Sequence, residues 1–200
     1  MKRITYISFL IFIFIACNNR DAGNSRQNDD QAAVYLKQGD SIVKITFDTL
    51  RKTLIKTIGT KGLSGALRFC NVQAKPITGM YASEGITVGR ESDKNRNPEN
   101  TLSAFDQVVW EKYREQVARK DSLKSVLISR SNEIHYYKPI FIQPMCLNCH
   151  GTPGKEISKE LLTVIDSLYP ADKAKGYKTG DLRGMWHIVF TKHMAGKDEQ

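Results

Sequence analysis

Apolar residues recur every three or four positions in the first half of the chain. Between residues 40 and 58 this is the spacing of side chains on one face of an α-helix. The apolar positions are Val43, Phe47, Leu50, Leu54 and Ile58. A second stripe after Gly62 continues through Leu67 and Cys70, which predicts another helical stretch with the Cys70 thiol facing inward. Because the residue before a proline disfavours helix, a kink or break is expected near Lys75, ahead of Pro76.

The rest of the chain mixes short β-type segments with further helical stripes. Clusters of β-branched and aromatic residues predict strands at 86–90, 134–142 and 186–191. Apolar periodicity predicts helices at 105–117, capped by Thr101 or Ser103, and at 156–168. The polar stretch 93–100 and the glycine-rich stretch 176–184 are expected to be connections. Helices combined with separated strands, after a long N-terminal helix, favour an α+β fold over an alternating βαβ sheet.

The N-terminus follows a different pattern. Lys2 and Arg3 precede an apolar run over residues 4–16, and small and polar residues follow Cys17. Such a run is too short to cross a bilayer, and its order is typical of a secretory signal. A buried N-terminal helix, the alternative, would need a polar face that the run lacks.

The small residue before Cys17 makes this segment resemble a bacterial lipoprotein signal. The resemblance implies that residues 1–16 are removed and that Cys17 carries a lipid. We therefore expect a flexible tether over 17–33, a domain over 34–195, and a protein of the cell envelope, lipid-anchored to a membrane and facing the periplasm.

Charge and cysteine content narrow the function classes. The 200 residues include 30 Lys and Arg against 21 Asp and Glu, a net charge of +9, but the basic residues are scattered singly. A nucleic-acid partner is therefore not expected. Four cysteines are too few for a disulfide scaffold. They are Cys17, Cys70, Cys146 and Cys149.

Cys146, Cys149 and His150 form the sequence C-x-x-C-H, which attaches c-type haem. Two thiols at this spacing can bond the two vinyl groups of one porphyrin, and the adjacent histidine then binds the iron. Attachment takes place outside the cytoplasm, in agreement with the export signal. The sequence therefore predicts one covalently bound haem c.

A zinc site, a redox dithiol and a disulfide are the alternative uses of these residues. Cys70, Cys146, Cys149 and His150 are acceptable zinc ligands, although adjacent residues rarely reach one tetrahedral ion without strain. A redox dithiol is expected at a helix start in a βαβ context, which does not surround Cys146.

Cys70 has no obvious partner if the other three cysteines are modified. It is either a small buried apolar side chain or a thiolate on the iron, on the side opposite His150, and its spacing does not decide between them. The other candidates for this position are His135, His187, His193, Met80, Met145, Met185 and Met194. An all-helical cytochrome c with Met185 or Met194 as ligand is a further alternative.

Several short blocks occur in a fixed order along the chain. They lie at 67–70 (LRFC), 88–90 (VGR), 96–100 (RNPEN), 138–140 (KPI), 146–151 (CLNCHG) and 176–184 (GYKTGDLRG). Together they resemble a bacterial PAS-like haem domain family, catalogued as a domain of unknown function, over about residues 40–192. The resemblance implies a PAS-like antiparallel sheet flanked by helices, one c-type haem, His150 as proximal ligand and Cys70 as distal ligand.

A thiolate ligand stabilises ferric iron, so Cys70 predicts a low-potential haem. With both axial positions filled no substrate site is expected, which argues against an enzyme. Two functions follow: electron transfer with a redox partner protein, or sensing of redox state or of CO or NO with a separate signalling partner. Arg90 and Arg96 could bind the haem propionates, or brace the 93–100 loop.

Overall fold

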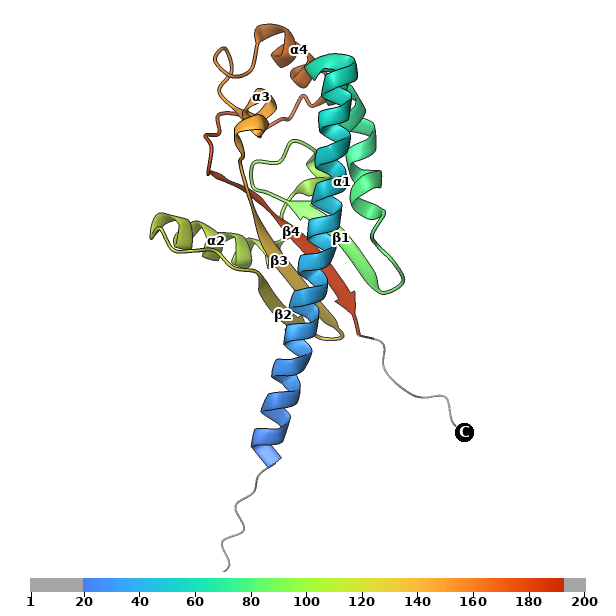
Figure 1. Ribbon diagram of the computed structural model, residues 1–200. Helices are drawn as coiled ribbons and strands as arrows, with labels where there is room; N and C mark the ends of the chain where they lie inside the picture. Colours follow the sequence, from blue (N-terminus) through green and yellow to red (C-terminus); the bar gives the residue numbers. More distant parts are fainter. Residues whose placement is uncertain (1–19, 193–200) are drawn as a thin grey trace, which may run out of the picture.

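The structure is a computed structural model that describes residues 20–192, with a four-stranded antiparallel sheet at its centre (Figure 1). The strands are β1 (Ile86–Glu91), β2 (Val126–Arg130), β3 (Glu133–Phe141) and β4 (Leu182–Thr191), in the order β1-β4-β3-β2. The helices are α1 (Arg20–Gly79), α2 (Ala104–Ala118), α3 (Leu147–His150) and α4 (Lys159–Leu168), with 3-10 turns η1 (Pro98–Asn100) and η2 (Pro144–Cys146). The α+β class, the antiparallel sheet with flanking helices and the long N-terminal helix are confirmed.

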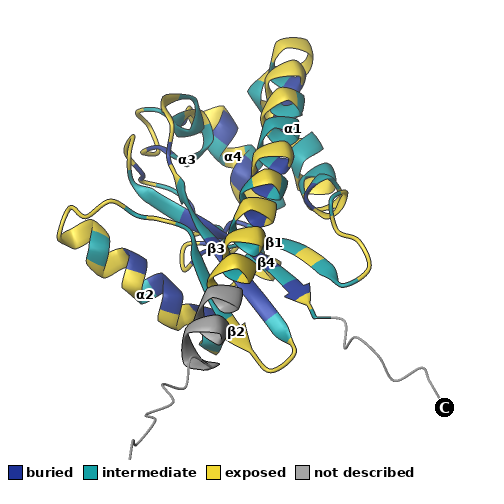
Figure 2. Cartoon of the chain, turned by 60° about the horizontal axis from the view of Figure 1, so that its bottom comes forward, coloured by how far each residue is buried: buried dark blue, intermediate teal, exposed yellow. Residues whose placement is uncertain are grey.

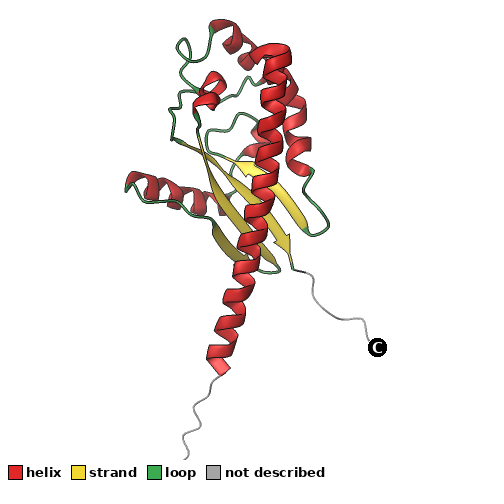
Figure 3. Cartoon of the chain, in the orientation of Figure 1, coloured by secondary structure: helices red, strands yellow, loops and turns green. Residues whose placement is uncertain are grey.

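Helix α1 crosses one face of the sheet and then turns back on itself (Figures 1 and 3). The reversal is at Gly62, whose φ of 65° costs glycine little because it has no Cβ. The break predicted near Lys75 is wrong, since the helix continues to Gly79 with Pro76 inside it. A glycine with positive φ therefore interrupts the helix where the proline does not.

The N-terminal boundary also differs from the sequence prediction. Residues 20–33, expected to be part of a flexible tether, are helical and continue into the packed part of α1. No proline interrupts the chain between Arg20 and Pro76, and each residue added to an existing helix gains a backbone hydrogen bond. Cys17, the predicted signal at 1–16 and residues 193–195 lie outside the described residues. Within 20–192, no helix is both long and apolar enough to span a membrane.

The two faces of the sheet bury separate clusters, as the burial colours in Figure 2 show for α1 and α2. On the α1 face, Val43 packs against alternate residues of β3 and β4, which are Ile134, Tyr136, Trp186, Ile188 and Phe190. On the α2 face, Val109, Trp110 and Tyr113 pack against Tyr137 and Met185. The predicted Ser103 cap is confirmed, because its side chain and that of Asp106 bond each other's backbone N–H.

A third cluster closes one end of the molecule. There α4 packs through Leu161 and Ile165 against Leu67, in the part of α1 that follows the reversal. Ser158 caps α4, which therefore begins at Lys159 rather than at residue 156. This packing holds α3 and the C-x-x-C-H motif beside the returning part of α1, where Cys70 lies (Figure 1).

Candidate functional site

The C-x-x-C-H motif follows the end of β3. Cys146 ends η2, and Cys149 and His150 belong to the single turn of α3. The glycine-rich connection supports this turn, since Gly176 N–H donates to the Gly151 carbonyl at 2.8 Å and Tyr177 N–H to the His150 carbonyl at 3.0 Å. Among the described residues, the thiols of Cys70, Cys146 and Cys149 form no disulfide bond. Three thiols are therefore available at this end of the fold.

The His150 ring is oriented by the main chain. Its Nδ1 lies 2.8 Å from the Ala174 carbonyl, which can only accept, so Nδ1 carries the hydrogen and Nε2 keeps its lone pair. Burial, and after it the nearby charge of Arg183, lowers the pKa of His150 well below its usual value of 6.5. A neutral imidazole with a fixed tautomer is the form that binds a metal through Nε2.

The motif opens onto a cavity of about 550 Å³. Cofactor pockets commonly measure about 300–1,000 Å³. The wall of the cavity contains Cys146, Cys149, His150 and, from α1, Cys70. Burial raises the pKa of the Cys70 thiol although Arg90 opposes it. The structure therefore brings the four residues of the predicted haem site to one space.

The lining of the cavity also shows which of the candidate axial ligands could reach a bound haem. Met145 lines it beside the motif. The other described candidates do not: Met80 is 66% exposed, and Met185 is buried in the cluster on the α2 face. His135 and His187 contact each other on that same face. His193 and Met194 lie outside the described residues, so Cys70 and Met145 are the candidates that the cavity supports.

The zinc alternative gains no support from the geometry. In the part of the chain that the structure describes, one group of three potential ligands has donor atoms within 4.8 Å of one another, and it is Glu91, Asp106 and His187. Cys70 and the three motif residues do not converge in this way. Their arrangement around a cavity suits a large planar group better than a single ion.

Arg96 braces the motif. Its guanidinium donates to the Cys149 carbonyl at 2.6 Å and to the Ala174 carbonyl at 3.3 Å, and it is paired with Asp172 at 3.1 Å. The Asp172 side chain is fully buried and that of Arg96 is 10% exposed. Of the two roles considered for Arg96, these contacts support bracing, of the motif as well as of the 93–100 loop.

Arg90 is placed differently. Its Nε is buried and has no hydrogen-bond partner in the described part of the chain, and the guanidinium lies over the Trp186 ring at 5.7 Å. Burial and the neighbouring Arg183 lower the pKa of Arg90 to about 10, and burial also lowers that of Arg183. Both side chains line the cavity, and within residues 20–192 neither forms an ion pair with a carboxylate.

Two partly buried guanidinium groups without a carboxylate partner in the described part of the chain favour an anionic ligand, because a desolvated charge without a counter-charge is costly. Haem carries two propionates, which guanidinium groups bind in a two-pronged manner. Arg90 and Arg183 therefore fit the cofactor that the motif predicts. Sequence reasoning assigned no role to Arg183, because its position beside Arg90 depends on how β1 pairs with β4.

Comparison with known proteins agrees with this fold. The crystal structure of the cyanobacterial heme-protein Tll0287 matches with 24% sequence identity and a TM-score of 0.54, covering 80% of this chain and 98% of that chain. At this identity the likeness shows the fold. No curated protein matches the sequence. A family model described as Tll0287-like matches residues 22–191, nearly the whole described part, and the chain therefore belongs to the Tll0287-like family.

Proposed function

We propose that this chain is a c-type haem protein with one haem bonded covalently to Cys146 and Cys149 and bound axially by His150 and Cys70. The observation that carries the proposal is the meeting of three free thiols and a neutral imidazole around one cavity. The structural relative is described as a heme-protein, which supports the same assignment. When bound, haem supplies one-electron redox chemistry.

Other residues of the chain have separate proposed roles in holding the haem. Ala174 holds the His150 ring through Nδ1, so that Nε2 is free for the iron. Arg90 and Arg183 bind the propionates, and Arg96 fixes the motif. A Cys70 thiolate stabilises the ferric state and gives a low potential. Two protein ligands leave no position for a substrate, so the proposed role is electron transfer or redox signalling rather than catalysis.

The proposed place of action is the cell envelope. A lipid on Cys17 would anchor the domain to a membrane, with α1 continuing the chain toward it. Mass spectrometry of the purified wild-type protein is expected to find Cys17 as the first residue, with acyl chains attached. A mature protein whose Cys17 carries no acyl chain would contradict lipid anchoring.

Gas or redox sensing is the second candidate, and the position of Cys70 favours it. Cys70 belongs to α1, and α1 also contacts β1, β2 and β3. Release of a Cys70–iron bond would therefore act on the helix that covers one face of the sheet. In this case Cys70 would give up its place to CO or NO, and a separate signalling partner would respond to the change in α1.

The axial ligands are tested in the full chain, expressed with a haem-attachment system. Optical and EPR spectra are recorded for wild type, Cys70→Ser and Met145→Leu, with haem-stained denaturing gels of all three. We expect covalent haem in every protein, a low-spin thiolate signal in wild type and Met145→Leu, and loss of that signal in Cys70→Ser. A spectrum that changes only in Met145→Leu would assign the ligand to Met145, and colourless protein would refute the haem proposal.

A further inference from the structure

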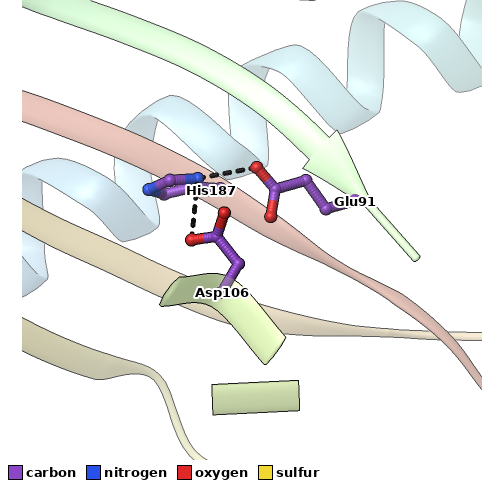
Figure 4. A group of neighbouring side chains, drawn as sticks. All are labelled: Glu91, Asp106 and His187. Carbon is purple, nitrogen blue, oxygen red and sulfur yellow. Dashed lines mark hydrogen bonds and ion pairs between the residues drawn. The ribbon is translucent and has the colours of Figure 1, made fainter. Parts of the chain in front are cut away.

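A second buried cluster lies on the α2 face of the sheet, behind the cavity. It consists of Glu91 from β1, Asp106 from α2 and His187 from β4 (Figure 4). His187 Nδ1 is 2.8 Å from Glu91 Oε1 and 3.6 Å from Asp106 Oδ1. The three side chains are only 16%, 5% and 12% exposed for Glu91, Asp106 and His187. The proposed function gives these groups no role.

A series of contacts connects this cluster to the surface. His187 Nε2 lies 3.0 Å from His135 Nδ1, and His135 Nε2 is 3.2 Å from Glu133 Oε2. The last contact is an ion-pair distance without hydrogen-bond alignment. The Glu133 side chain is 46% exposed, whereas that of His135 is 8% exposed. Solvent therefore reaches one end of the series, and the buried carboxylates form the other.

Each element packed around the cluster carries charged or hydrogen-bonding side chains that face it or its neighbours. From α2, Asp106 accepts from Ser103 and from Tyr137, whose hydroxyl on β3 is 2.6 Å away. β3 also carries Glu133 and His135, β4 carries His187, and β2 adds Arg130, which acts on Tyr137. On β1, Glu91 follows Arg90, whose guanidinium lies on the cavity side.

Glu91 has a free place for a proton. Its Oε1 is bonded to His187, but its Oε2 is buried and has no hydrogen-bond partner among residues 20–192. Burial raises the pKa of Glu91, and the nearby Asp106 adds to the rise although His187 opposes it. Burial and His187 lower the pKa of His135, so a proton that passes that ring is not retained there.

The cluster and the cavity share two strands. Arg90 on β1 is paired with Trp186 on β4, and both line the cavity. The next residue along each strand, Glu91 and His187, joins the cluster on the opposite face, because successive side chains of a strand alternate. Glu91 also borders the cavity, so the two groups of residues adjoin each other.

We propose that the Glu91–Asp106–His187 cluster takes up one proton from solvent, by way of Glu133 and His135, when one electron enters the cavity site. The inference rests on the proposed function, since the electron is the one that a bound haem accepts. One electron from an external one-electron donor reduces ferric to ferrous iron, and one proton binds the cluster, so the net charge is unchanged. Reoxidation releases both.

The same three ligand atoms could instead hold a divalent cation. The hydrogen bonds within the cluster favour the proton, because His187 Nδ1 already bonds Glu91 and Tyr137 already bonds Asp106. Metal analysis of the purified protein distinguishes a cluster that binds a proton from one that binds a divalent cation. Zinc in a one-to-one ratio with wild type, absent from His187→Gln, would overturn the proton proposal.

The test measures the midpoint potential of the haem protein between pH 5 and 9, and the proton uptake on reduction with a pH indicator. Wild type is compared with His187→Gln, with Glu91→Gln and with the control Glu115→Gln. Glu115 lies on α2, is 68% exposed and is outside the cluster. We expect the potential of wild type and control to fall as the pH rises, because reduction takes up a proton. The pH dependence and the proton uptake should be lost in both cluster variants.

Each outcome decides a different point. An unchanged pH dependence in His187→Gln and Glu91→Gln would overturn this inference and leave the haem proposal intact. A protein without a haem spectrum would overturn the proposed function and this inference together. Should His187→Gln fail to fold, Glu91→Gln and Asp106→Asn, which keep the side-chain shape, decide by the same two measurements.

Discussion

The guanidinium of Arg96 and the main-chain carbonyl of Cys149 are joined by a hydrogen bond of 2.6 Å. The same side chain reaches the Ala174 carbonyl, which is the acceptor for His150 Nδ1. One arginine thus fixes both the turn that carries the second motif cysteine and the group that orients the axial histidine. Asp172 neutralises it and is itself fully buried.

Replacing Arg96 by alanine is expected to lower the free energy of unfolding by about 3–5 kcal/mol, because it breaks a buried ion pair and leaves the fully buried Asp172 with only the more distant Lys175, 3.7 Å away, as a cation. The matched control is Lys75→Ala. Lys75 pairs with Glu99, and these side chains are 72% and 58% exposed. An exposed pair of this kind contributes about 0–1 kcal/mol. Urea unfolding of the two variants measures the difference, and equal losses would refute the bracing role.

Two glycines of α1 are expected to respond oppositely to the same substitution. A Cβ at Gly39 would overlap the Tyr136 ring, whereas nothing lies within 4 Å of a Cβ at Gly59. Gly39→Ala should destabilise by about 1–3 kcal/mol through overpacking against the sheet. Gly59→Ala should stabilise by about 0.5–1 kcal/mol, since alanine loses less entropy in a helix. Thermal unfolding that moves in the same direction for both would contradict this packing of α1 on the sheet.

Local patterns predicted most of the secondary structure. The strands β1, β3 and β4 and the helices α2 and α4 are confirmed because their apolar periodicity and caps are local signals. Strand β2 was missed, since its five residues are only partly buried or exposed. The apolar pattern that predicts α2 includes Val108 and Val117, but these side chains are 68% and 41% exposed. Periodicity alone does not show how wide the covered face of a helix is.

Only the contiguous part of the candidate site could be predicted from the residues themselves, because neighbours in the chain give a local signal. C-x-x-C-H is a contiguous motif, so its residues could be named without a fold. The position of Cys70 at the same cavity came from a family resemblance and not from its spacing. The pairing of β1 with β4 brings Glu91 to His187 and places Arg90 and Arg183 without a carboxylate partner in the described part of the chain. Local sequence patterns do not reveal which strands pair.

Asp106→Asn is expected to destabilise the protein in a pH-dependent way. Burial raises the pKa of Asp106, but hydrogen bonds from Ser103 and Tyr137 outweigh this and lower it below 3.8. A lowered carboxyl pKa gives stability that is present above the unfolded value and lost as the pH falls through the folded one. The variant should lose about 1.5–3 kcal/mol at pH 7, the range for hydrogen bonds to a charged group.

The difference between wild type and Asp106→Asn should shrink below about pH 4, where the unfolded carboxyl becomes protonated. Unfolding curves at pH 7, 5 and 3 measure it. Glu111→Gln is the control on the same helix, because the Glu111 side chain is 45% exposed and pairs with Arg114 on the surface. A gap that stays constant over this range would show that the carboxylate charge of Asp106 is not what stabilises the fold.

Replacing Arg183 by glutamine is expected to act in opposite directions on two quantities. Without haem, Arg183 is a partly buried cation that lies over the Tyr177 ring at 5.5 Å and has no carboxylate partner in the described part of the chain, so its removal should raise the free energy of unfolding. With haem, the positive charge favours the reduced iron. Its loss should lower the midpoint potential by about 40–90 mV, which corresponds to roughly 1–2 kcal/mol for a unit charge at an effective dielectric constant of about 20.

The two measurements use the same set of proteins, prepared with and without haem attachment. Arg90→Gln should behave like Arg183→Gln, because both guanidinium groups line the cavity. Arg114→Gln removes the same charge from an exposed site on α2 and should change neither quantity appreciably. If Arg183→Gln destabilised the haem-free protein, Arg183 would already have a partner there, and the argument for an anionic ligand would lose its basis.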